Sequence, residues 1–346
     1  MDVKLKIGQR IKELRETATM SQKDLSYTAD LDRSYIASVE NGQRNISIVN
    51  IEKIATALGV TLKEFFNNVE FDNAAKRTNQ IKKSIEAAIK SNGTEGKNNL
   101  IRSQKPIKLL HEVVKAELLR NKVNPDLLNP PASQSHGELS LAGFFKKKNQ
   151  DICIVPNNVK PKKEMLNFQG ILYGQEDKYG FDFTEKTLSI NVRSQLSSSS
   201  KNFDTLYERT FAEALNLHLR CPKMVLGEFY MIAVNEYDST GANNKEIKYK
   251  NVKGVAKHIE KYLLSFAAVN DRESVTGDHF KYERVCLLIV DFSKKIPKVY
   301  NTDEELKKDN LLPEKSIATI KNLNFPSFAE DLLKIYTTRF GTGKFK

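Results

Sequence analysis

Met20-Ser-Gln-Lys-Asp-Leu25 and Arg33-Ser-Tyr-Ile-Ala-Ser-Val-Glu-Asn-Gly42 are the stretches that decide the fold of the N-terminal part of this chain. Ser21 can cap a helix, and Asp24 stands three residues later, at the position of a capping box. A second helix is expected from about Asp32 to Glu40, and Asn41-Gly42 can end it because both residues tolerate a left-handed backbone. The sequence therefore predicts two short helices joined by a tight turn.

Three more short helices are expected around this pair, between residues 4 and 66. Ile7, Ile11 and Leu14 repeat at helical spacing before it. After it, the segment Ser47–Leu58 carries apolar residues on one face and Gly59 ends it, and Thr61–Phe66 supplies the last helix. Residues 1–70 are therefore expected to form an α-helical domain of five helices.

The second helix of the central pair has the pattern of a DNA-reading helix. In a helix-turn-helix this helix enters the major groove, while the first helix anchors on the backbone. Ile36 and Val39 would pack inward and leave a polar face, on which Arg33 can read guanine. The residues expected to contact bases or phosphates are Gln22, Arg33, Ser34, Tyr35, Ser38, Asn41 and Arg44.

A family resemblance supports this interpretation. Three stretches resemble the XRE family, and within it the small controller proteins of restriction-modification systems. They are Met20-Ser-Gln-Lys-Asp-Leu25, Tyr35-Ile-Ala-Ser-Val-Glu-Asn-Gly-Gln-Arg-Asn45 and Asn50-Ile-Glu-Lys-Ile-Ala-Thr-Ala-Leu-Gly-Val60. The resemblance covers about a fifth of the chain. It implies that the protein binds inverted repeats in double-stranded DNA as a homodimer.

Composition sets the broad class. The chain has 346 residues, enough for two domains, and its net charge of +12 suits a polyanionic partner. No apolar run approaches the ~20 residues that span a bilayer, and the N-terminus lacks the pattern of a signal peptide, so a cytoplasmic protein with no membrane partner is expected. No metal-ligand or disulfide spacing links the isolated cysteines Cys153, Cys221 and Cys286 or the histidines His136, His218, His258 and His279.

Residues 71–132 are expected to form a basic helical linker, with a break at Ser91–Gly96. It is interpreted either as a solvated helix pair or as an arm that follows DNA or dimerises. Residues 133–346 are expected to form an α/β domain. Its predicted strands are Asp151–Pro156, Thr187–Arg193, Met224–Val234, Glu246–Val252 and Val285–Phe292, and its predicted helices are Phe203–Arg220, Val255–Asn270 and Phe325–Tyr336.

This second domain contains candidate residues for phosphodiester cleavage, which needs carboxylates to hold Mg²⁺. A PD-(D/E)xK-like fold runs strand, strand, strand, helix, strand, with its metal on adjacent strands. Asp151 opens an apolar strand, as the metal-binding aspartate of that fold does, while Asn191 and Arg193 stand where its Glu-x-Lys pair is normal. Glu213, on the buried stripe of the next helix, can replace the missing acid, or it can form an ion pair with Arg209.

The candidate catalytic residues are therefore Asp151, Asp182, Arg193 and Glu213, of which Asp151, Asp182 and Glu213 are the candidate ligands of Mg²⁺. Asp182 competes with Asp151, because it lies nine residues before Asn191. Further acids and a lysine remain as alternatives: Glu228 within an apolar strand, and Asp238 with Glu246 and Lys248.

A second resemblance covers Ser133–Phe292. Three stretches of this segment resemble type II restriction endonucleases that carry an N-terminal XRE domain. They are Gln134-Ser-His-Gly-Glu-Leu139, Ile190-Asn-Val-Arg-Ser-Gln-Leu-Ser-Ser198 and Tyr282-Glu-Arg-Val285. The resemblance implies a Mg²⁺-dependent, homodimeric endonuclease. Two alternatives stay open: a transcriptional regulator whose second domain dimerises or senses a ligand, and a nuclease-derived domain that has lost activity.

Overall fold

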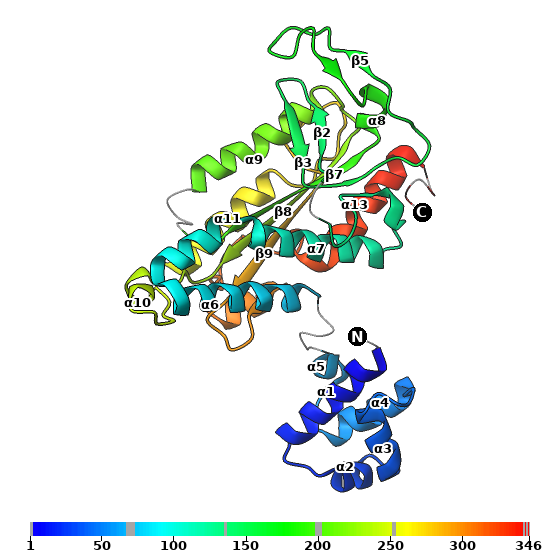
Figure 1. Ribbon diagram of the computed structural model, residues 1–346, viewed down its shortest axis with the longest axis vertical. Coiled ribbons are helices and arrows are strands. Elements are labelled where there is room, and N and C mark those ends of the chain that lie inside the picture. The colour runs from blue at the N-terminus through cyan, green and yellow to red at the C-terminus, as the bar shows by residue number, and fades with distance from the viewer. Residues whose placement is uncertain are drawn as a thin grey trace. The chain divides into compact units, whose positions relative to one another are not determined.

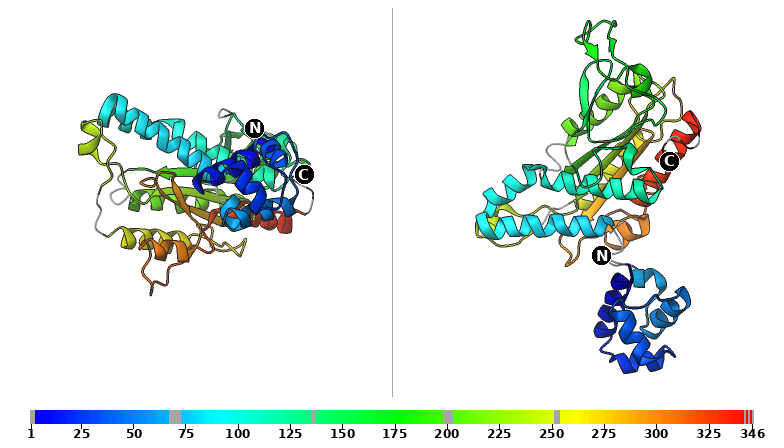
Figure 2. Two further views of the ribbon diagram at one scale, coloured as in Figure 1. Left: turned by 90° about the horizontal axis from the view of Figure 1, so that it is seen from below. Right: turned by 45° about the vertical axis from the view of Figure 1, so that its right-hand side comes forward.

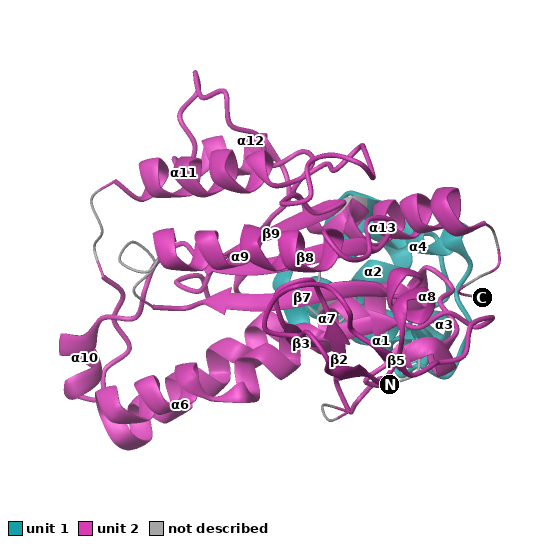
Figure 3. Cartoon of the chain, turned by 90° about the horizontal axis from the view of Figure 1, so that it is seen from above, with its two compact units in different colours: residues 1–76 teal, residues 77–346 magenta. Residues whose placement is uncertain are grey.

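The computed structural model describes residues 3–66, 73–134, 137–197, 203–250, 254–341, 343 and 345. The chain divides into two compact units, Met1–Lys76 and Arg77–Lys346, which are coloured separately in Figure 3. Each unit has its own cluster of buried apolar residues. In the described part of the chain, no helix combines the length and the apolar character needed to cross a membrane.

The first unit holds the five expected helices, α1 (Val3–Thr17), α2 (Gln22–Thr28), α3 (Arg33–Glu40), α4 (Ile48–Ala57) and α5 (Leu62–Phe66). The expected capping box is confirmed: Ser21 Oγ accepts a hydrogen bond from the Asp24 backbone, and the Asp24 carboxylate accepts one from the Ser21 backbone. Asn41 is the C-cap of α3, and Gly42 after it adopts a φ of 69°, which ends that helix. The helices close around a core that includes Ile11, Leu25, Ile36, Ile54 and Phe65.

The segment expected as a linker forms two long helices, α6 (Asn73–Arg102) and α7 (Gln104–Arg120), and most of it belongs to the second unit. The break expected at Ser91–Gly96 is only a kink inside α6, where Asn92 and Gly93 leave helical geometry. Gly93 has a φ of 58°, and a Cβ there would lie 2.9 Å from the carbonyl oxygen of Ala242. A glycine at this point therefore allows α6 to bend and to pack closely against the Ala242 backbone, and the helix continues beyond it.

The second unit is built on a mixed six-stranded sheet in the order β1-β4-β7-β8-β9-β10. The central strands β7, β8 and β9 run parallel, and their outer neighbours β4 and β10 pair antiparallel to them. The strands are β1 (Leu128–Asn129), β4 (Ile152–Ile154), β7 (Leu188–Gln195), β8 (Val225–Ala233), β9 (Arg284–Asp291) and β10 (Lys298–Tyr300). Two small antiparallel sheets pair β2 (Leu139–Ala142) with β3 (Lys147–Gln150) and β5 (Glu164–Met165) with β6 (Glu176–Asp177).

Helices cover both faces of the large sheet (Figures 1 and 2). The crossover helices α9 (Phe203–His218) and α11 (Val255–Ala268) share a core with Leu226, Tyr230 and Ile232 of β8. On the other face, Gly227 of β8 lets α13 (Phe325–Phe340) approach, because a Cβ there would meet Leu332 at 2.8 Å. The remaining helices are short: η1 (Pro125–Leu127), α8 (Phe181–Glu185), α10 (Ser239–Asn243) and α12 (Asp303–Lys308).

The expected α/β character of this unit is confirmed, and four of the predicted strands correspond to β4, β7, β8 and β9. The strand predicted at Glu246–Val252 is wrong for its described residues 246–250, which make only an isolated bridge between Tyr249 and Tyr237. Its last two residues lie outside the described part of the chain. The segment follows α10, and among the described residues no further strand pairing accompanies this bridge.

Candidate functional site

The outward face of α3 is the candidate nucleic-acid interface of the first unit. Ile36 and Val39 are buried in the core, while Arg33, Ser34 and Asn41 are exposed, as the sequence pattern predicts. An open cavity of about 780 Å³ lies beside the start of α3 and is lined by residues that include Arg33, Tyr35, Asn50 and Tyr27. The start of α3 therefore offers polar side chains and open space together.

Tyr35 connects this face to its neighbours. Its hydroxyl accepts a hydrogen bond of 2.9 Å from Asn50 Nδ2 on α4. The guanidinium carbon of Arg44 lies 5.6 Å from the centre of the Tyr35 ring, within the range of a cation–π contact. Ser38 turns its hydroxyl back to the carbonyl oxygen of Ser34 at 2.7 Å. Tyr35 thus orients Arg44, and Ser38 has one partner already within the helix.

A polar network centred on Glu40 joins both α1 and α2 to α3. Glu40 at the end of α3 forms a two-pronged pair with Arg15 of α1, with Nε–Oε1 and Nη2–Oε2 distances of 2.7 and 3.0 Å. Gln22, at the start of α2, donates from Nε2 to Glu40 Oε2 at 2.8 Å. The hydrogen bond to Glu40 raises the pKa of Arg15 further. Gln22, predicted to contact phosphate, is therefore held in place by α3 itself.

The second unit contains a buried cluster of charged side chains between β7, β8 and α9. Arg193 of β7 lies between two carboxylates: it pairs with Glu213 of α9, and its Nε lies 2.9 Å from Glu228 Oε1 on β8. Lys148 of β3 also pairs with Glu213. The exposed fractions of the Arg193, Glu213 and Glu228 side chains are 14%, 6% and 0%. The cluster is therefore a salt-bridge network largely removed from water.

Glu228 is the member of this cluster whose charged form is least well stabilised. Neither of its carboxylate oxygens has a hydrogen-bond partner of acceptable geometry among the described residues. Burial raises its pKa to about 7, although Arg193 acts in the opposite direction. Burial alone would lower the pKa of Arg193, but Glu228 raises it above the usual value. Glu228 thus carries a proton more readily than an exposed glutamate.

Polar side chains close the cluster on its other side. Asn191 lies opposite Glu228 in the β7–β8 register, and its Nδ2 is 3.4 Å from both Glu213 Oε2 and the Tyr282 hydroxyl. The Tyr282 hydroxyl donates to the carbonyl oxygen of Thr210 at 2.8 Å, and burial raises the pKa of Tyr282 well above 10. The Oδ1 of Asn191 is buried without a hydrogen-bond partner among the described residues.

The structure brings some of the predicted catalytic residues together and separates others. Asp151 lies at the edge of the cluster, between β3 and β4, and its Oδ2 accepts a hydrogen bond of 2.7 Å from the Val192 backbone. Asp182 lies elsewhere, exposed on α8 and paired with Lys186 at 3.2 Å. The alternatives in the second Glu-x-Lys segment are also outside the cluster: Asp238 caps α10, and Glu246 pairs with Lys248 at the surface.

The arrangement of the cluster does not fit a bound Mg²⁺ ion. Mg²⁺ needs oxygen ligands in near-octahedral geometry, with carboxylates turned toward it. Here Arg193 and Lys148 neutralise Glu213, and Glu228 faces Arg193. Within the described ranges, no group of three acids, histidines or cysteines is placed to hold a metal ion. Lys148 and Arg193 therefore supply the positive charge that a metal ion would otherwise supply to these carboxylates.

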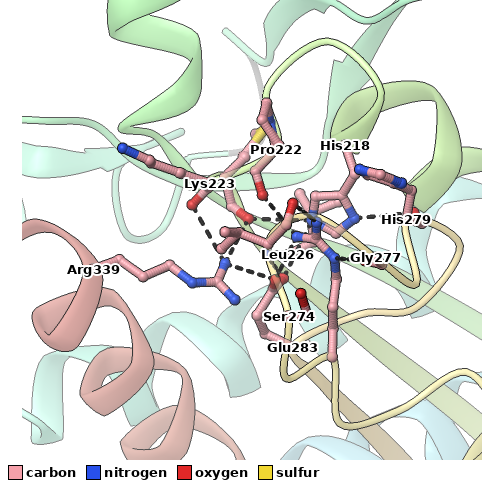
Figure 4. A network of polar contacts seen from close by, with 12 residues as sticks. His218, Pro222, Lys223, Leu226, Ser274, Gly277, His279, Glu283 and Arg339 are labelled. Atoms are coloured by element: carbon pink, nitrogen blue, oxygen red, sulfur yellow. Dashed lines mark hydrogen bonds and ion pairs between the residues drawn. The ribbon is translucent and has the colours of Figure 1, made fainter.

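A second buried network, centred on Glu283, lies elsewhere in the same unit (Figure 4). Glu283 contacts Arg272 and Arg339 at 3.1 and 2.7 Å and accepts a hydrogen bond of 2.7 Å from the Leu226 backbone. Its Oε2 also lies 3.4 Å from His218 Nε2. Burial alone would raise the pKa of Glu283, but His218 and the arginine Arg339 lower it to about 2. The network ties α9, the start of β8 and α13 together, and its carboxylate is fully engaged.

Comparison with known proteins concerns the first unit. A helix-turn-helix family model matches residues 11–65. The chain is 47% identical over 70 residues to the control protein C.MunI of a Mycoplasma species, a match that covers 20% of this chain and 95% of that protein. Through its first unit, the chain belongs to the helix-turn-helix family.

Other relatives match the helix-turn-helix unit over similar lengths. The control protein C.BamHI of Bacillus amyloliquefaciens is 38% identical over 77 residues, covering 22% of this chain and 95% of that protein. The crystal structure of the restriction-modification controller protein C.AhdI from Aeromonas hydrophila is 51% identical and covers 18% of this chain and 96% of that one, with a TM-score of 0.18. The family assignment therefore describes about a fifth of the chain.

Several members of the charged cluster were not predicted from the sequence. Lys148 lies in the basic run before Asp151, but a run of lysines does not indicate which one turns inward. Tyr282 lies just before β9 and 72 residues after Thr210 of α9, so its hydroxyl meets the Thr210 backbone only in the fold. The strongest available signal was Glu228, a single acid inside an apolar strand, which the sequence placed only among the alternatives.

Proposed function

We propose that this protein is a DNA-binding control protein that recognises a specific duplex sequence through its helix-turn-helix unit. The observation that carries the proposal is the combination of the 47% identity to a control protein with an α3 whose polar face is outward and whose apolar face is buried. Arg33 stands in the first turn of α3, where side chains reach base edges in the major groove. We further propose that the protein acts as a homodimer on an inverted repeat, as its resemblance to controller proteins implies.

Some residues of the helix-turn-helix unit would contact DNA, and others hold its helices in place. Arg33 presents the planar donor fork that matches guanine O6 and N7, and Ser34 lies next to it on the exposed side. Arg44, held over Tyr35, supplies a positive charge for phosphate. The Arg15–Glu40–Gln22 contact fixes α2 against α3, so it sets the angle at which α3 would meet the groove.

Operator binding can be tested on the full-length chain. Duplexes selected from a random pool by the protein supply the specific site, and fluorescence anisotropy measures its affinity relative to a scrambled duplex. Arg33→Ala is expected to weaken specific binding by about 10- to 100-fold, because one bidentate base contact contributes ~1–3 kcal/mol. Arg209→Ala, which removes an exposed arginine from α9, serves as the charge-matched control and is expected to bind normally. Failure to select any sequence would overturn the proposal.

A second candidate function, Mg²⁺-dependent cleavage of DNA by a PD-(D/E)xK-like endonuclease, is supported by one observation. Within the large sheet the chain order is β1, β4, β7, α9 and β8, with β5, β6 and α8 inserted between β4 and β7, and Asp151, Arg193 and Glu213 converge near β7. The order of strands and helix agrees with that expected of such nucleases. The pairing of Glu213 with two cations opposes it, and for this reason the control function is preferred.

Plasmid DNA that carries the selected site decides between the two candidates. We expect binding without cleavage, whether Mg²⁺ or EDTA is present. Discrete fragments that require Mg²⁺ and disappear in Glu213→Gln would establish the endonuclease instead. Retained operator binding by Glu213→Gln would show that this variant is folded.

A further inference from the structure

A cavity of about 340 Å³ lies in the second unit along the first two turns of α7. Lys105, Lys108 and His111 line it, together with Glu112 and the loop residues Ser133 and Gln134. The spacing of three residues places the two lysines and His111 along one side of the helix. Every residue that lines the cavity belongs to the second unit, whereas α3 belongs to the first.

The lysines of this cavity are available to a ligand. The side-chain amines of Lys105 and Lys108 form no hydrogen bond or ion pair with any residue that the structure describes, apart from the electrostatic effect of Lys108 on His111. Lys105 is exposed and Lys108 is half-buried, so both amines can approach an anion in the cavity. Two unpaired cations on one wall favour a negatively charged occupant.

His111 supplies the independent observation that indicates a ligand. The residue is 6% exposed, and its Nε2 atom is buried without a hydrogen-bond partner in the described part of the chain. Burial lowers the pKa of His111, so its ring is neutral at pH 7 and carries one N–H donor. A buried polar atom with no partner is costly, and an oxygen atom of a ligand would relieve that cost.

The one carboxylate in the lining does not oppose an anion. Glu112 Oε1 lies 3.2 Å from Lys115 Nζ, and its Oε2 accepts a hydrogen bond of 2.9 Å from the Ser133 backbone. Lys115 is fully buried and also donates to the carbonyl oxygens of Pro131 and Gln134. The charge of Glu112 is therefore compensated by Lys115, which at the same time fixes the loop that forms the far wall.

We propose that this cavity binds a phosphate group of the DNA backbone, so that the second unit contributes its own contact to the duplex. Two flexible ammonium groups and a neutral N–H donor suit the several oxygens of a phosphate. The net charge of +12 and the helix-turn-helix unit of the same chain favour DNA over a small anion as the source of that phosphate. The inference rests on the proposed DNA binding and extends it to the second unit.

The salt dependence of binding to a non-operator duplex tests this contact on the full-length chain. Each phosphate that a lysine neutralises adds about −0.9 to the slope of log K against log salt concentration. Because both lysines would neutralise the same phosphate, Lys105→Gln/Lys108→Gln is expected to make the slope shallower by about 1. Lys257→Gln/Lys334→Gln removes two exposed lysines from α11 and α13 with the same change of net charge, and its slope should remain that of the unsubstituted chain.

His111 is tested with two variants that separate its donor from its volume. His111→Gln keeps an N–H donor and is expected to retain most of the duplex affinity, whereas His111→Leu is expected to lower it several-fold. Thermal unfolding followed by circular dichroism identifies any variant that is misfolded. Equal slopes for the two double-lysine variants would overturn the proposal.

Inorganic phosphate distinguishes the two sources of the ligand. If phosphate stabilises the unsubstituted chain against heat but the duplex slope is unaffected by Lys105→Gln/Lys108→Gln, the site binds a small phosphate only, and the DNA contact is overturned. A non-operator duplex is used because its affinity does not depend on base recognition by α3. Failure to select an operator would thus overturn the proposed function while leaving the slope comparison valid.

Discussion

Arg193 shows how one side chain can determine the chemistry of its surroundings. It lies between Glu213 and Glu228, which come from α9 and β8, the two elements that follow β7 in the chain. With Arg193 present, the two acids are a salt-bridge network; without it, they would be neighbouring buried carboxylates. Arg193, which stands where the lysine of a Glu-x-Lys pair is normal, is therefore the residue that organises the cluster.

The raised pKa of Glu228 leads to a prediction about stability and pH. A carboxyl group whose folded pKa is about 7 binds a proton more tightly when folded than when unfolded, so its contribution to stability falls as pH rises from about 4.5 to 7. Glu228→Gln removes this titration. Relative to the unsubstituted chain, the variant should become progressively more stable between pH 5 and pH 8, as measured by urea unfolding with far-ultraviolet circular dichroism.

The comparison needs a carboxylate that lies outside the cluster. Asp182→Asn changes an exposed acid on α8 and should show the same pH trend as the unsubstituted chain. A stability difference for Glu228→Gln that does not vary with pH would contradict the assignment of the raised pKa to Glu228.

Glu283 is expected to behave in the opposite way. Its folded pKa of about 2 lies below its unfolded value, so its stabilising effect is complete above about pH 4.5 and disappears as pH falls toward 2. Glu283→Gln leaves Arg272 and Arg339 without their buried counter-charge and should destabilise the second unit by about 3 kcal/mol or more at pH 7. Urea unfolding at pH 7 and pH 3 should show this loss shrinking in acid; an equal loss at both values would refute it.

At the scale of elements, α2 depends on its N-terminal cap. Ser21 and Asp24 satisfy each other's backbone N–H groups, and Ser21→Ala removes one of these bonds. The substitution should lower the stability of the first unit by about 1 kcal/mol. Ser34→Ala, at an exposed serine within α3, is the matched control in the same thermal unfolding experiment. If both variants unfold alike, the cap does not contribute as the geometry indicates.

Elements governed by neighbouring residues were predictable, and those governed by distant contacts were not. The five helices of the first unit follow from local signals such as Ser21, Ser47 and Gly42, which act within a few residues. The apolar runs of β7, β8 and β9 also identify themselves, because parallel strands are buried on both faces. The segment at Glu246 was misassigned because alternation alone does not supply a neighbouring strand.

The same distinction applies to the candidate sites. The face of α3 was predictable, because helical periodicity separates Ile36 and Val39 from Arg33 and Ser34 within one helix. The charged cluster was predicted only in part, since Lys148, Glu228 and Tyr282 meet through strand register and the packing of α9. No spacing along the chain encodes those contacts.

At the scale of the whole molecule, separate apolar cores predict two unfolding transitions. Ile54 is fully buried in the first unit and Leu263 in the second. Ile54→Ala and Leu263→Ala should each cost about 2–5 kcal/mol. Differential scanning calorimetry of the full chain should show each substitution lowering a different transition temperature. A single transition shifted equally by both substitutions would mean that the two units unfold as one.

The position of Arg193 between two acids also restricts the order in which this protein can evolve. A lineage that replaced the arginine first would confine two like charges in a space closed to water, and such an intermediate would fold poorly. A lineage that first replaced Glu228 with a neutral residue would leave Arg193 and Lys148 with Glu213, and could then change the arginine safely. Natural variation at these positions should therefore be correlated, with neutral residues at 228 preceding the loss of the arginine.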